Sequence, residues 1–305
     1  MKKGIWLALG AYVLWGLFPF YWHILSPVPA LQLLGHRIIW SFLLLFGFVL
    51  LSGGWIAFRK DALRPNQLRI YSMAAIFIAI NWLTYVWSVE NGYILETSLG
   101  YFINPLFSVL LGVAFLRERL RPWQWVPIGL ATVGVVYLAL VYRAVPWISL
   151  TLAVSFGLYG LVKKKATLGT AQGLTLETGL LFLPAVVYLI YTQFSGTGAF
   201  LHSGTTLDLM MVGAGLVTTV PLVLFAAGAR RIPLSLLGIL QYINPSIQFV
   251  LGTLVYHEPF DTARLVGFAI VWLALVVFAV EGFLAGRRKP QAADPVEAVE
   301  LPAQD

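Results

Sequence analysis

Polar side chains recur at helical spacing within two otherwise apolar stretches of the sequence. Each stretch carries three of them at positions i, i+3 and i+7, namely Tyr101, Asn104 and Ser108 in the first and Gln241, Asn244 and Gln248 in the second. This spacing puts each triplet on one face of a helix. Two polar faces on apolar helices are expected to line a cavity and bind a polar substrate; the alternative is that they only join helices by hydrogen bonds.

A proline follows each of these asparagines, at Pro105 and Pro245. Proline has no N–H to donate to the carbonyl four residues earlier, which belongs to Tyr101 in one stretch and to Gln241 in the other. We therefore expect a kink and a free carbonyl on each polar face, which would add to a polar surface for a substrate.

A second group of candidate residues lies in the apolar stretch 68–88. Asn81 and Tyr85 share a helical face, and Trp82 is adjacent. Aromatic rings beside an amide are typical of a pocket for an amphipathic organic molecule. Since the chain has 11 Trp and 13 Tyr, packing or a place at the membrane interface is the alternative for any one ring.

Two ionisable residues, His36 and Arg37, lie inside the apolar stretch 31–51, where a charge is costly. Arg37 keeps its charge and needs a counterion or water. In one interpretation Arg37 binds a substrate carboxylate, and His36 or Glu96 carries a coupling proton. In the other, Arg37 forms a structural ion pair with Glu96 or Glu90, or extends to the outer interface.

Three further carboxylates are expected to have structural roles or simple charge partners. Glu118 and Glu258 end apolar stretches near loops and are interpreted as structural. Glu177 aligns with His36 at an offset of 141 residues and could be its symmetric counterpart, although the lysines at 163–165 could neutralise it.

The composition indicates what positions these residues. The chain has 305 residues, of which 59% are hydrophobic and 11% charged, and a soluble domain of this size could not bury so much apolar surface. Ten apolar runs are long enough to span a bilayer. They cover residues 4–22, 31–51, 68–88, 93–116, 123–141, 146–162, 174–193, 208–228, 234–256 and 262–284.

The basic residues give this topology a direction. Ten spans put both termini on one side, and 17 of the 20 Lys and Arg residues then fall on that side. Arg143 and Arg264 fall on the other side, and Arg37 lies within a span. By the positive-inside rule the basic side is cytoplasmic, so both termini are predicted to be cytoplasmic.

An internal repeat divides the chain. Residues 101–118 and 241–258 share Ile, Asn-Pro, Leu-Gly and Glu at a fixed offset of 140 residues. The repeat unit then holds five spans, and because five is odd the second copy is inverted in the membrane, as in many secondary transporters. We predict an all-α membrane protein with repeats at 1–142 and 143–285 and a disordered cytoplasmic tail at 286–305. A duplication kept only for packing is the alternative.

Three segments carry a resemblance to a known family: LLGHRIIWS at 33–41, NWLTYVWSVENGYILETSLGYFINPL at 81–106 and LGILQYINP at 237–245. Together with the two repeats, they resemble the RarD family of EamA-domain transporters in the drug/metabolite transporter superfamily. The resemblance covers about residues 4–284. It implies a ten-helix permease of the inner membrane and leaves the substrate open.

Several other classes of protein are excluded by what the sequence lacks. There is no cysteine, no G-x-x-x-x-G-K-[ST] motif and no G-x-S-x-G motif, and the four histidines show no metal spacing. We expect no enzyme, no cofactor, no metal and no nucleic-acid partner.

The expected function is a secondary transporter of small organic metabolites or drug-like molecules, working by alternating access. Its partners would be a small-molecule substrate and membrane lipids, with a possible homodimer through the fifth and tenth spans. The lining is expected from the third, fourth, eighth and ninth spans, with Arg37 from the second. The alternative is a non-transporting membrane scaffold or a lipid-handling protein. Proton exchange, other antiport and facilitated diffusion all remain open.

Overall fold

The structure, a computed structural model, describes residues 1–91, 93–142, 146–255 and 262–287. Within these ranges the chain is helical and contains no β-strand. In chain order the helices are α1 Lys2–Gly16, α2 Phe18–Ile24, α3 Ala30–Leu51, α4 Trp55–Ala62, α5 Pro65–Glu90, α6 Ile94–Leu116, the 3-10 turn η1 Pro122–Gln124, α7 Trp125–Tyr142, α8 Pro146–Lys165, α9 Thr170–Phe194, α10 Thr205–Ala229, α11 Leu234–Leu240, α12 Ile243–Leu254 and α13 Thr262–Arg287.

Nine of the ten predicted spans correspond to segments of the described chain that are long and apolar enough to cross a membrane. The remaining one, predicted over 146–162, is helix α8, which has 20 residues and ends in three lysines. Its helical structure is confirmed, whereas its passage through the membrane stays a prediction. The predicted tail 286–305 falls almost entirely outside the described residues.

Two of these spans are interrupted. Helices α1 and α2 meet at Leu17, and α11 and α12 meet at Gln241 and Tyr242. Although Pro245 cannot donate to the carbonyl of Gln241, that carbonyl accepts the backbone N–H of Asn244 at 3.1 Å. The prediction of a free carbonyl at Gln241 is therefore wrong, because a tighter i to i+3 turn satisfies it. Helix α6 continues through Pro105 without a break.

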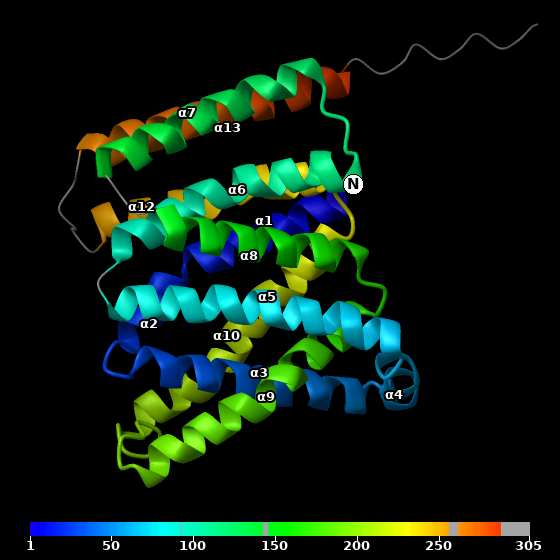
Figure 1. The fold of residues 1–305 in the computed structure, drawn as a ribbon, viewed down its shortest axis with the longest axis vertical. Helices are drawn as coiled ribbons and strands as arrows, with labels where there is room; N and C mark the ends of the chain where they lie inside the picture. Colours follow the sequence, from blue (N-terminus) through cyan, green and yellow to red (C-terminus); the bar gives the residue numbers. More distant parts are fainter. Residues whose placement is uncertain (92, 143–145, 256–261, 288–305) are drawn as a thin grey trace, which may run out of the picture.

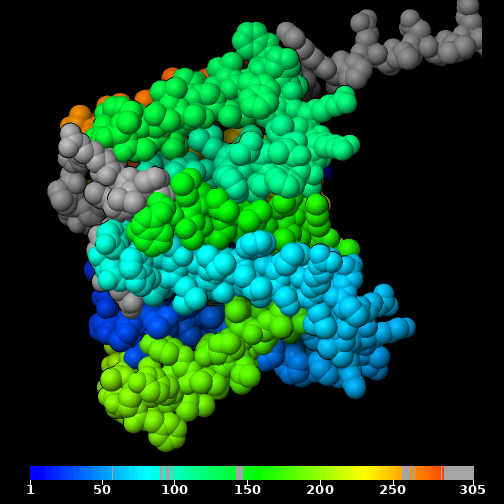
Figure 2. Space-filling view, in the orientation of Figure 1, coloured from blue at the N-terminus to red at the C-terminus, as the bar shows by residue number. Residues whose placement is uncertain are grey.

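The long helices lie side by side in one bundle. Helices α7 and α13 pack together at one end of it, and α3 packs on α9 toward the other end (Figure 1). The N-terminus and the short helix α4 lie at the same side of the view, which agrees with the predicted placement of the basic segments (Figure 1). Side chains of α8, α5 and α9 form successive bands across one face, below those of α7 (Figure 2).

The main core lies between α1, α8, α10 and α11. Tyr12 and Tyr159 are fully buried there, and Phe225 is 1% exposed. The rings of Phe225 and Tyr159 stack at 6.0 Å, and Trp15 adds a further ring to the cluster. Large apolar side chains also remain on the outer surface, as in a protein surrounded by lipid, and Leu140 is 73% exposed.

Hydrogen bonds join the first half of the chain to the second. The hydroxyl of Tyr12 donates to the carbonyl of Leu237 at 3.0 Å. The Glu118 carboxylate accepts the backbone N–H groups of Leu234 at 2.6 Å and Ser235 at 2.9 Å, and the Ser235 hydroxyl at 2.7 Å. Glu118 therefore caps the N-terminus of α11, which agrees with its interpretation as a structural residue. Glu258 lies outside the described residues.

Replacing Glu118 by alanine is expected to destabilise this junction. The change leaves two backbone donors of α11 and the Ser235 hydroxyl without their acceptor, at a cost of about 1–3 kcal/mol. Thermal unfolding of the purified protein in detergent micelles measures it. Asp61→Ala is the matched control, since Arg64 is the one ion-pair partner of Asp61 among the described residues and the site is exposed. Equal unfolding temperatures for the two variants would contradict the capping role.

Candidate functional site

A cavity of about 250 Å³ lies between the two halves of the chain. Apolar and aromatic side chains form much of its wall, and several amides, hydroxyls and one arginine point into it. It is lined by Trp15, Phe18, Pro19, Trp22, Arg37, Ile78, Asn81, Trp82, Tyr85, Gly100, Tyr101, Asn104, Leu152, Phe156, Thr218, Leu222, Gln241, Asn244 and Gln248. Such a mixture is typical of a site for a small organic molecule.

Nine of the twelve residues predicted from the sequence meet in this cavity. They are Arg37, Asn81, Trp82, Tyr85, Tyr101, Asn104, Gln241, Asn244 and Gln248. The structure thus brings together the two polar faces, which are 140 residues apart, through the packing of α6 against α11 and α12.

The other three predicted residues do not line the cavity or cannot be placed. Ser108 is buried against Gly238, where α6 crosses α11. His36 lines a separate pocket between α3 and α9, where its Nδ1 accepts the indole N–H of Trp40 at 3.3 Å. The side chains of Glu96 and Glu90 lie outside the described residues.

Three side chains contact Arg37. Its Nε donates to the hydroxyl of Thr218 at 3.0 Å, which links α3 to α10. Its guanidinium carbon lies 5.0 Å from the ring centroid of Trp22 and 4.8 Å from that of Trp82, so that both rings make cation–π contacts with it. No ion pair joins it to a carboxylate among the described side chains.

The amides have different degrees of hydrogen bonding. Asn81 donates to the carbonyl of Leu152 at 2.9 Å and to the hydroxyl of Ser155 at 3.1 Å, so its amide nitrogen also joins α5 to α8. Gln248 donates to the side-chain oxygen of Asn244 at 2.9 Å. By contrast, Asn104 is 4% exposed, and its side-chain oxygen has no hydrogen-bond partner in the described structure.

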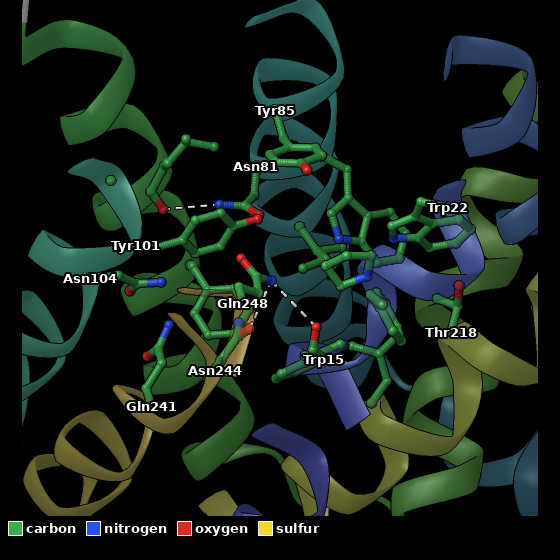
Figure 3. A pocket seen from close by; sticks show the side chains of 18 of the residues that line it. Trp15, Trp22, Asn81, Tyr85, Tyr101, Asn104, Thr218, Gln241, Asn244 and Gln248 are labelled. Carbon is green, nitrogen blue, oxygen red and sulfur yellow. Dashed lines mark hydrogen bonds between the residues drawn. The ribbon is translucent and has the colours of Figure 1, made fainter. Parts of the chain in front are cut away.

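The polar groups are separated within the cavity. Asn104, Gln241 and Asn244 are grouped on one side, whereas Trp22 and Thr218, which contact Arg37, lie on the other (Figure 3). Gln248 and Tyr101 project between them (Figure 3). A molecule that filled the space would meet a cation at one side and a set of amides at the other.

The lining predicted from the sequence did not include the first span. Trp15, Pro19 and Trp22 line the cavity from α1 and α2. Pro19 is the signal that could have found it, because proline cannot donate to the carbonyl of Trp15. A backbone N–H at the end of α1 donates to that carbonyl instead, and the Gln248 amide also donates to it at 3.4 Å. Leu152 and Phe156 from α8 were also missed, since apolar residues in apolar helices carry no distinguishing pattern.

A buried ion pair lies near the basic end of α8, outside the cavity. Lys163 Nζ and Glu177 Oε1 are 2.6 Å apart, and both side chains are 3% exposed. The hydroxyl of Tyr159 donates to the second oxygen of Glu177 at 3.2 Å. Of the two interpretations offered for Glu177, the contacts support neutralisation by a lysine. Among the described residues no group of His, Asp and Glu could hold a metal ion.

Comparison with known proteins identifies the family of this chain. Residues 2–140 match the model of the EamA-like transporter family. Protein RarD of Streptomyces exfoliatus is 45% identical over 291 residues, which cover 94% of this chain and 91% of that protein. The chain belongs to the RarD family of EamA-like transporters.

Further comparisons agree with this RarD-family assignment. An uncharacterized transporter of Pseudomonas aeruginosa is 43% identical over 95% of this chain and 98% of its own length. A solved crystal structure that is 18% identical has the same fold, with a TM-score of 0.69 over 94% of this chain and 99% of that one. With nine apolar helices in its described part, this RarD-family chain is a multi-pass membrane protein.

Proposed function

We propose that the chain transports small organic metabolites or drug-like molecules across the inner membrane by alternating access, through the cavity between its two halves. The observation that carries the proposal is the convergence of nine polar and aromatic residues from distant segments on one cavity of about 250 Å³. A scaffold would have no use for such a space, and a lipid-handling enzyme would need a nucleophile and a base, which this lining does not provide.

Ten spans arranged as inverted repeats at 1–142 and 143–285 are part of the proposal. Equivalent helices make equivalent contacts, which supports it: α1 packs on α10 as α8 packs on α5, and α6 packs on α8 as α12 packs on α1. In this arrangement both termini are cytoplasmic, and α7 and α13, which do not line the cavity, are free for lipid or for a second copy of the chain.

In the proposed transport cycle, this structure is the outward-facing conformation. Most lining residues lie toward the ends of their helices opposite to the basic segments, whereas Glu118 and Lys163 make contacts at the basic ends. With the basic side cytoplasmic, the cavity faces outward and the inner side is closed. Transport then requires that these inner contacts open while the outer part closes.

Flux measurements test this function directly. Proteoliposomes containing the full chain, loaded or incubated with a mixture of metabolites and analysed by mass spectrometry, are expected to move a subset of them. Protein-free liposomes are the control. If no compound moved in either direction across a broad panel, the transport proposal would fail.

Asn244→Ala is expected to reduce this flux without unfolding the protein. The change removes a lining amide and the acceptor of the Gln248 amide, which together orient the polar side of the cavity. Loss of one such interaction corresponds to about tenfold in substrate binding. Asn91→Ala, at an exposed asparagine outside the cavity, is the matched control and should transport normally. Equal flux from both variants would remove Asn244 from the site.

A further inference from the structure

The cavity has one charged group among its described lining residues, and that group is a cation. Arg37 meets hydroxyl and aromatic groups, and no described carboxylate balances its charge. A cation within the membrane is costly unless an anion or water compensates it. The rings of Trp22 and Trp82 contact the guanidinium but accept no ordinary hydrogen bond, so its remaining N–H groups can still donate to another molecule.

The remaining N–H groups of Arg37 match one kind of anion. With Nε already donating to Thr218, the two terminal nitrogens have no hydrogen-bond partner in the described part of the chain. A guanidinium offers such paired donors in a planar fork that matches the two oxygens of a carboxylate. The contacts with Trp22 and Trp82 and the hydrogen bond to Thr218 restrain the side chain, so that little freedom is lost when the anion binds.

A second, independent feature lies on the other side of the cavity. The side-chain oxygen of Asn104 is buried and accepts no hydrogen bond, although it lines the cavity. A buried acceptor without a donor is costly, and a donor on a bound molecule would recover that cost. The neighbouring side chains Gln241 and Asn244 make this side of the cavity polar as well (Figure 3).

The space between the two features is small and largely apolar. Trp15, Ile78, Phe156 and Leu222 contribute its apolar wall. A volume of about 250 Å³ corresponds to roughly eight water molecules at their volume in the liquid. This restricts the body of the bound molecule to about one ring or a short branched chain.

We propose that the cavity binds small organic carboxylates that also carry an N–H or O–H donor beside an apolar body. The carboxylate binds the terminal nitrogens of Arg37, the donor binds the side-chain oxygen of Asn104, and the apolar body contacts the ring of Phe156 and its neighbours. This inference rests on the proposed transport function and narrows its substrate class.

Three probes with one phenyl body separate the two features. 3-Phenyllactate has both the carboxylate and the hydroxyl donor, 3-phenylpropanoate lacks the donor, and methyl 3-phenyllactate lacks the charge. Isothermal titration calorimetry with the full chain in detergent measures their affinities. We expect 3-phenyllactate to bind at least tenfold more tightly than either of the others.

Variants of the protein assign each preference to its residue. Arg37→Gln is expected to abolish the advantage of the acid over its ester, and Asn104→Leu to abolish the advantage of the hydroxyl, each without changing the other preference. Arg37→Lys keeps the positive charge but loses the paired N–H donors of the guanidinium, so it should retain only part of the preference for the acid over its ester. This variant replaces Arg37→Gln in the experiment if Arg37→Gln does not fold. Asn91→Ala should keep both preferences.

The results distinguish this inference from the function on which it rests. An ester that binds as well as the acid, or an acid preference that persists in Arg37→Gln, overturns the role of Arg37. A hydroxyl preference that persists in Asn104→Leu overturns the role of Asn104. If proteoliposomes transport cations or neutral compounds but no carboxylates, the inference fails and the transport function stands. If they transport nothing, the proposed function itself fails.

Discussion

A disulfide between positions 4 and 231 is expected to abolish transport, and reduction of that disulfide is expected to restore it. A Cβ atom at Gly4, in α1, would lie 2.7 Å from the Cβ atom of Arg231, which follows α10. A shift of about 1 Å between the two segments brings the pair to the separation that a disulfide needs. The two positions belong to different halves and lie at the basic ends of their helices. If alternating access separates these ends, a covalent bond between them holds the protein in the conformation described here.

The chain is well suited to this experiment because it contains no cysteine. Gly4→Cys with Arg231→Cys therefore adds the only two thiols, and mild oxidation followed by flux measurement in proteoliposomes gives the result. The single-cysteine variants control for the substitutions themselves. A cysteine pair at Gly134 and Val271 joins α7 to α13, away from the cavity, and should leave flux largely intact. Undiminished flux through the oxidised 4–231 pair would contradict alternating access at this face.

The sequence predicted the membrane helices well because a bilayer imposes one simple requirement, about 20 apolar residues a span. It was least informative for 146–162, where three lysines follow the apolar run. It also could not predict that the first and ninth spans are each two helices. Proline indicates that a helical hydrogen bond is missing, but the surrounding packing decides between a continuous helix, as at Pro105, and a break, as near Pro245.

The candidate site was predictable wherever polar groups interrupt an apolar helix, since their burial is costly and needs a reason. Spacing alone did not separate Asn104, which faces the cavity, from Ser108, which packs on Gly238. Nor could it separate Arg37 from its neighbour His36, because adjacent residues on a helix point about 100° apart and the sequence does not state which direction faces the cavity. Thr218 carries no signal, since threonine is common in apolar helices.

Breaking the Lys163–Glu177 ion pair from one side is expected to be among the most destabilising single changes in the chain. Lys163→Met leaves the Glu177 carboxylate buried without its cation, and Glu177→Leu leaves the ammonium without its anion. Removing one partner of a buried pair costs about 3–5 kcal/mol. Tyr159 compensates little of this, because a single hydroxyl hydrogen bond at 3.2 Å replaces neither charge.

The double variant separates the cost of an unpaired charge from the value of the pair. Lys163→Met with Glu177→Leu buries no charge, so it should unfold close to the temperature of the original protein or above it. The matched control is Arg121→Met, which breaks a 3.0 Å pair with Glu281 at a site where the arginine is 49% exposed, and which should cost no more than about 1 kcal/mol. Thermal unfolding in detergent micelles orders the four variants. If the two single variants of the buried pair cost no more than Arg121→Met, or if the double variant is no more stable than they are, water must reach this pair and the closed inner side described here is not closed.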